Sequence, residues 1–155
     1  MRLTLDMLGV PYKYVTGYNS SAQAQLALSR VYAAQSRWED AVDYLELAVH
    51  FNPEAAGAWV ELGMALNMLG RADAARAALS EATHLEPRNA AAWIALGGVH
   101  KAAEAWQEAI DCYRHAVSVV PDSADALCLL GYALYQAGNY DEARQQLEAA
   151  VALAP

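Results

Sequence analysis

A period of 34 residues runs through most of this chain and constrains its fold more than any other feature. Alanine recurs at this spacing in two series, and proline recurs in a third. The members are Ala41, Ala75, Ala109 and Ala143; Ala48, Ala82, Ala116 and Ala150; and Pro53, Pro87, Pro121 and Pro155. Three independent series at one period indicate stacked structural repeats. The chain therefore divides into an N-terminal segment, 1–21, and an array of units 22–55, 56–89, 90–123 and 124–155.

Each unit predicts two helices. In the second unit, Trp59, Leu62 and Leu66 share one helical face, and Gly70 supplies a stop signal after it. A second apolar stripe follows and ends at Pro87. The 35 alanines of the chain favour helix throughout. The expected first helices are 23–35, 57–69, 91–103 and 125–137, and the expected second helices are 39–51, 73–85, 107–119 and 141–153.

The repeated residues resemble the tetratricopeptide repeat, whose pattern runs W-x2-L-G-x2-Y, then A-x3-F-x2-A, then P. The second unit carries it as Trp59, Leu62, Gly63, Leu66, Ala75, Leu79, Ala82 and Pro87, and the third as Trp93, Leu96, Gly97, His100, Ala109, Tyr113, Ala116 and Pro121. The fourth carries it as Leu127, Leu130, Gly131, Leu134, Ala143, Leu147, Ala150 and Pro155, and the first is a looser match. The resemblance covers 22–155. It implies an all-α solenoid of four stacked helix-turn-helix repeats that form a right-handed superhelix.

The same resemblance implies a concave groove, lined by the first helices, that binds a peptide or a partner helix. The candidate peptide-binding residues are Leu26, Arg30, Val60, Met64, Asn67, Met68, Ile94, Gly98, Lys101, Cys128, Tyr132 and Tyr135. In the fourth unit, Cys128, Tyr132 and Tyr135 add a second apolar face to a helix whose leucines already serve the packing face. A helix that is apolar on both faces requires cover on both.

The expected ligand is an amphipathic helix or an extended apolar segment. Methionines such as Met64 adapt to varied apolar shapes, and Gly98 leaves room for an incoming backbone. Arg30 and Lys101 would pair with acidic residues at the rim. The alternative is a tight superhelix, in which these apolar side chains only touch the next repeat.

No catalytic, cofactor-binding or metal-binding pattern accompanies the repeats. The chain has no glycine-rich phosphate loop, no HExxH and no GxSxG. His50 and His84 are one repeat apart, too far to share a zinc ion, and are interpreted as surface residues. We therefore expect no enzymatic activity. The net charge of −8 opposes nucleic-acid binding, and no apolar run approaches the ~20 residues that cross a membrane.

Three questions stay open at the level of the sequence. Segment 1–21 contains many apolar residues and is expected to be partly extended, either capping the array or occupying its groove. Helix 141–153 offers apolar surface and could form a homodimer. Besides an interaction adaptor, the chain could be a self-associating structural scaffold or a targeting module of a larger, enzyme-containing polypeptide. The cytoplasm is the expected compartment, with the periplasm as the alternative.

Overall fold

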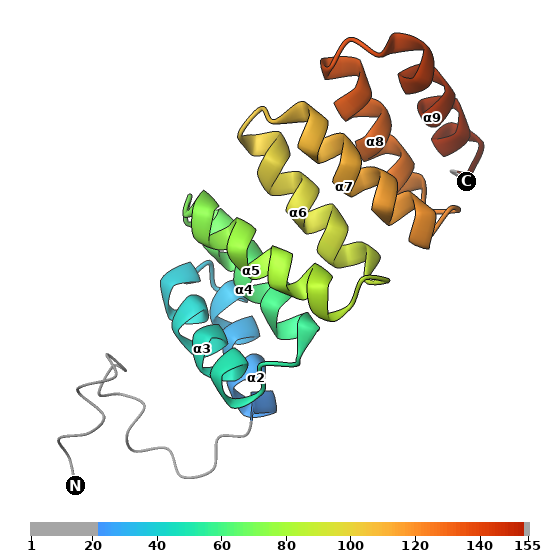
Figure 1. The fold of residues 1–155 in the computed structure, drawn as a ribbon. Helices are drawn as coiled ribbons and strands as arrows, with labels where there is room; N and C mark the ends of the chain where they lie inside the picture. Colours follow the sequence, from blue (N-terminus) through green and yellow to red (C-terminus); the bar gives the residue numbers. More distant parts are fainter. Residues whose placement is uncertain (1–21, 154–155) are drawn as a thin grey trace, which may run out of the picture.

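The computed structural model describes residues 22–153, and every element in that range is an α-helix (Figure 1). The first helices of the four units are α2 (Ala22–Ala34), α4 (Ala56–Met68), α6 (Ala90–Ala102) and α8 (Ala124–Gln136). The second helices are α3 (Trp38–Phe51), α5 (Ala72–Leu85), α7 (Trp106–Val119) and α9 (Tyr140–Leu153). All eight expected helices are present, and each begins one residue earlier than the sequence pattern placed it.

The helices stack in chain order. Each first helix packs against the second helix of its own unit, and each second helix packs against the first helix of the next. Figure 1 shows the pairs in one row, from α2 and α3 at the blue end to α8 and α9 at the red end. The all-α solenoid of four repeats is confirmed. Segment 1–21, with its predicted capping or groove-occupying role, lies outside the described residues.

The repeated glycines allow the two helices of a unit to approach closely. A Cβ atom at Gly97 would lie 2.6 Å from Cε1 of Tyr113, and one at Gly131 would lie 2.6 Å from Cγ of Leu147. Both distances are far below van der Waals contact, so a side chain at these positions would force the helices apart. Gly63 meets Leu79 in the same way.

The turn inside each unit uses one left-handed residue. Gly70 and Gly138 adopt φ values of 72° and 83°, and Ser36 and Glu104 hold the equivalent places with φ values of 59° and 56°. Left-handed backbone is accessible to glycine without steric cost. The sequence therefore places a glycine at only two of the four turns that need this conformation.

Hydrogen bonds from tryptophan link consecutive units. The indole Nε1 of Trp59 donates to the carbonyl of Pro53 at 2.8 Å, and that of Trp93 donates to the carbonyl of Pro87 at 2.9 Å. The proline that ends one unit is thus bonded to the helix that opens the next. Asn89 caps α6, since its side chain accepts a hydrogen bond from the Ala92 amide.

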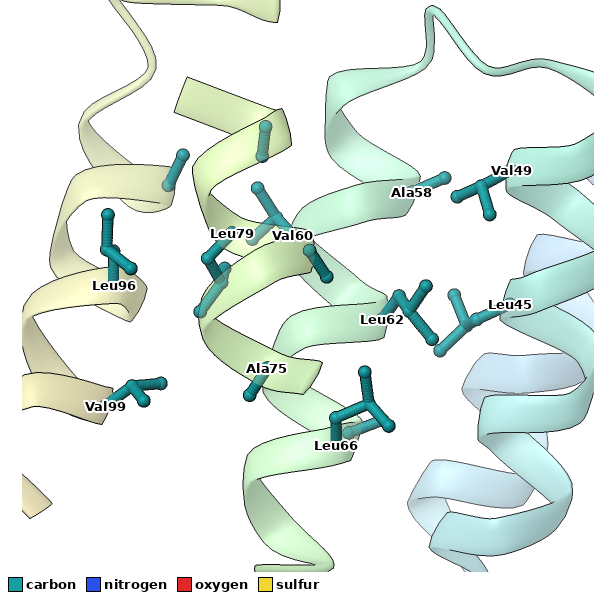
Figure 2. Close-up of a cluster of buried hydrophobic side chains, with 14 of the residues drawn as sticks. Leu45, Val49, Ala58, Val60, Leu62, Leu66, Ala75, Leu79, Leu96 and Val99 are labelled. Atoms are coloured by element: carbon teal, nitrogen blue, oxygen red, sulfur yellow. The ribbon is translucent and has the colours of Figure 1, made fainter. Parts of the chain in front are cut away.

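The core between the helices consists of two apolar clusters, one contributed by α3 to α7 and one by α7 to α9. Figure 2 shows Leu62 of α4 facing Leu45 of α3, and Ala58 of α4 facing Val49 of α3. All four side chains are buried. Across the described part of the chain, no helix is long and apolar enough to span a membrane.

Candidate peptide-binding groove

The candidate groove residues form rows that cross the four first helices. Because the units repeat at 34 residues, side chains at equivalent positions follow one another from α2 to α8. One row consists of Arg30, Met64, Gly98 and Tyr132. Met64 is 54% exposed and Tyr132 is 45% exposed. The row therefore presents apolar and aromatic surface on both sides of a glycine.

A second row lies one helical turn further along the same helices. It contains Asn67 of α4, Lys101 of α6 and Tyr135 of α8, with Met68 beside Asn67. Met68 and Tyr135 are each more than half exposed, while Asn67 and Lys101 are half-buried. The exposed apolar side chains of α4 and α8 thus extend over two turns of each helix.

The third predicted row is divided between the core and the surface. Val60, a candidate site residue, is only 8% exposed and belongs to the apolar cluster contributed by α3 to α7. Leu26 packs against that same core, and Ile94 is half-buried. Only Cys128 in this row is exposed. This row thus differs from the two rows that carry the methionines and tyrosines, whose apolar side chains are exposed.

Gly98 leaves open space at the centre of the first row. A Cβ atom built on Gly98 would meet no heavy atom within 4 Å, and the same is true of Gly57 on α4. Neither glycine has a packing role of the kind that Gly97 has. A ligand backbone could therefore approach the helices closely at these two positions.

Aromatic neighbours orient the two groove tyrosines. The ring of Tyr132 meets that of Trp106 edge-on, with centroids 6.1 Å apart, and the ring of Tyr135 meets that of Tyr140 at 5.7 Å. Such edge-to-face pairs restrict the rotamers of both partners. Sequence reasoning missed Trp106 and Tyr140 as supports of the groove, although both hold the same position at the start of a second helix.

Arg30 does not face the groove as a free cation. Its guanidinium donates to both carboxylate oxygens of Glu61 on α4, at 3.0 and 3.1 Å from Nε, and this hydrogen bonding raises the pKa of Arg30 above its ordinary value. The expected pairing of Arg30 with an acidic ligand is therefore replaced by an ion pair between adjacent units. No carboxylate among residues 22–153 pairs with Lys101, which stays available at the groove.

Within the described range, no three His, Cys, Asp or Glu side chains are close enough to hold a metal ion. His50 and His84 both lie on exposed surface, as the sequence indicated. Burial raises the pKa of the Cys112 thiol to about 11, which leaves it protonated and unreactive at neutral pH.

Comparisons with known proteins agree with this architecture. The family model of the cilia and flagella-associated protein 70 C-terminal domain, a tetratricopeptide-repeat model, matches residues 12–155. Two crystal structures of MamA are each 28% identical to this chain, with TM-scores of 0.80 and 0.79. Each match covers 85% of this chain, with 77% and 72% of the respective MamA chains.

A further structure, MamA MSR-1 C2, has a TM-score of 0.73 at 21% identity, over 88% of this chain and 80% of its own. A search of curated proteins finds no match. The family match spans nearly the whole chain and all four helix pairs. The chain therefore belongs to the family of the cilia and flagella-associated protein 70 C-terminal domain and is built of tetratricopeptide repeats.

Proposed function

We propose that the array binds an apolar or amphipathic segment of a partner protein in the groove formed by α4, α6 and α8. Tetratricopeptide-repeat domains generally serve as protein-interaction modules. The observation that carries this finer proposal is the set of exposed apolar side chains around Gly98, namely Met64, Met68, Tyr132 and Tyr135. Exposed apolar surface that is contiguous and rimmed by polar groups marks interaction sites.

The chemistry of the groove fits an apolar segment with an acidic residue at its edge. Met64 and Met68 accept varied apolar shapes, and the tyrosines combine a broad ring with a polar tip. Lys101 lies between the two groups and has no carboxylate partner in the described range. We infer that Lys101, rather than Arg30, attracts the acidic residue of the ligand.

A peptide selection tests this proposal. A random peptide library displayed on phage is selected on the full chain, and the affinity of the enriched peptides is measured by fluorescence anisotropy. The expected peptides carry apolar residues at helical or alternating spacing. Tyr132→Ala and Met64→Ala should each weaken binding about tenfold, since a few central aromatic and apolar anchors carry most of an interface's energy.

Phe51→Ala is the matched control, because Phe51 is exposed and apolar but belongs to a second helix, α3, of which it is the last residue. It should leave the affinity unchanged. Equal losses for Phe51→Ala and Tyr132→Ala, or enriched peptides without apolar residues, would count against the groove.

The proposed compartment is the cytoplasm. Cys112 and Cys128 are both free, and Cys128 is exposed. An exposed free thiol suits a reducing compartment, where thiols are kept from pairing. Two alternative functions, a self-associating structural scaffold and a targeting module of a larger polypeptide, do not require that the groove binds a ligand.

A further inference from the structure

The first helix of the array exposes apolar side chains that every later unit buries. Leu28 of α2 is 41% exposed, whereas its equivalent in the next unit, Leu62, is 4% exposed. Val31 is likewise exposed, and its equivalents Ala65 and Val99 are buried. These later residues are covered by the second helix of the preceding unit. We define the α2 face as Ala24, Leu28 and Val31.

The last helix shows the complementary pattern. Leu147 and Val151 of α9 are 37% and 74% exposed, whereas their equivalents on α3, Leu45 and Val49, are 2% and 7% exposed. A surface hollow of about 480 Å³ lies beside them and is also lined by Tyr140. We define the α9 face as Leu147 and Val151.

The structure contains a junction of these same residue types inside the array. Where the first and second units meet, Leu62 faces Leu45 and Ala58 faces Val49 (Figure 2). One period before Ala58 and Leu62 stand Ala24 and Leu28 of the α2 face. Three periods after Leu45 and Val49 stand Leu147 and Val151 of the α9 face. All four residue types are therefore identical on the exposed α2 and α9 faces and at this buried junction.

The ion pair across this junction also has charged equivalents in the first and fourth units. Arg71 of the second unit pairs with Glu39 of the first, with the guanidinium and carboxylate 3.3 Å apart. The equivalent of Arg71 in the first unit is Arg37, and the equivalent of Glu39 in the fourth unit is Asp141. An α2 face placed on an α9 face would thus bring Arg37, which pairs with Asp40 of its own copy at 2.9 Å, to the aspartate of the other copy.

We propose that a second copy of this chain seats its α2 face on the α9 face, so that copies join head to tail by the same step that joins the first two units. Leu28 of one copy then covers Leu147 of the other, and Ala24 covers Val151. Because the two faces differ, each pair leaves one face of each kind free. A contact of this heterologous kind extends into an open chain of copies.

Electrostatics set the conditions under which such assembly is strongest. Each copy carries a net charge of −8, so the copies repel one another at long range. Salt screens this repulsion while leaving the apolar contact intact. Association should therefore strengthen as the ionic strength rises, which is the opposite of the behaviour of an interface held by charge alone.

Sedimentation equilibrium of the full chain at several concentrations tests the proposal. The average mass should rise with concentration and pass that of two chains. Leu28→Glu removes the α2 face and Val151→Glu removes the α9 face. Each variant alone should associate at least about tenfold more weakly. Val151 is preferred to Leu147 for this purpose because Leu147 also packs over Gly131.

Mixing the two variants gives the decisive result. The intact α9 face of Leu28→Glu should bind the intact α2 face of Val151→Glu, which yields a 1:1 dimer that grows no further. Met64→Glu is the matched control, since it places the same charge on exposed apolar surface of the groove and should leave assembly unchanged. Val31→Glu replaces Leu28→Glu if circular dichroism shows that the latter is unfolded.

Four outcomes would overturn the proposal. The wild-type chain could remain monomeric at about 1 mM, which would mean that the α2 and α9 faces do not bind each other even with a Kd of about 1 mM. Leu28→Glu could still dimerise, which indicates pairing of two α9 faces. The mixture could stay monomeric. Leu28→Glu could lower the melting temperature without changing the mass, which indicates that segment 1–21 covers the α2 face within one chain.

Discussion

Two adjacent glycines of α6 allow the packing role of one to be measured against the other. A Cβ atom at Gly97 would lie 2.6, 2.9 and 3.0 Å from three ring carbons of Tyr113, whereas one at Gly98 would meet no heavy atom within 4 Å. Tyr113 is completely buried, so its ring has no free direction in which to move. Gly97→Ala should therefore strain the contact between α6 and α7, and Gly98→Ala should not.

The magnitudes follow from two opposing effects. Replacing glycine by alanine inside a helix stabilises the protein by about 0.5–1 kcal/mol, and this gain applies equally to both positions. Overpacking a well-filled core costs about 1–3 kcal/mol and applies only to Gly97. The free energy of unfolding should thus rise by about 0.5–1 kcal/mol for Gly98→Ala. It should lie about 1–3 kcal/mol lower for Gly97→Ala than for Gly98→Ala.

Chemical denaturation followed by circular dichroism measures this difference, with peptide binding as a second readout. Gly98→Ala fills the open space in the groove, so the stabilised variant should bind the selected peptides more weakly. Equal stabilities for the two variants would refute the assignment of Gly97 to the helix contact. Unchanged peptide affinity in Gly98→Ala would refute the close approach of a ligand backbone at that position.

Two other features of the repeats give further predictions. Ser36→Gly and Glu104→Gly should each stabilise the protein by about 1 kcal/mol in thermal unfolding, because glycine adopts the left-handed turn without the steric cost that Ser36 and Glu104 bear. Burial raises the pKa of Tyr113 to about 12 and that of Cys112 to about 11. Both groups therefore hold their protons more tightly when folded than when unfolded. The stability they contribute is complete below about pH 9 and is lost as the pH rises through 11 and 12. In Tyr113→Phe, the free energy of unfolding should fall less over this range, as measured by denaturation curves recorded from pH 8 to 12.

The repeat period predicts the helices well because packing repeats with it. Alanine at positions such as Ala41 and Ala75 is buried in each unit, and the prolines Pro53, Pro87 and Pro121 follow shortly after the ends of α3, α5 and α7. The helix ends are set by short-range signals, of which the Asn89 cap is one. The helices could therefore be predicted from spacing and residue type, and their stacking from the resemblance to the tetratricopeptide repeat.

The details of the groove depend on residues that the period does not relate. Val60 and Cys128 occupy equivalent positions, yet Val60 is buried in the core while Cys128 is exposed. Arg30 and Glu61 stand 31 residues apart and pair across two units, a spacing that no single helix reveals. Residues that line a surface could be proposed from the sequence, but the side chains that cover or neutralise them could not.

The linear order of the helix contacts has a consequence for motion. Among the described helices, the pair α2 and α3 contacts one neighbouring unit and so does the pair α8 and α9, through α7, whereas each unit between them contacts two. In arrays of this kind, stability is close to a sum over units and junctions, so the unit of α8 and α9 opens more readily than an interior unit. Tyr132 and Tyr135 belong to that unit, while Met64 and Met68 belong to an interior one. A ligand that contacts both sets of residues would therefore hold α8 and α9 against the interior units. It should slow amide exchange in α8 and α9 far more than in α4, because ligand binding and the local folding of that unit are then coupled.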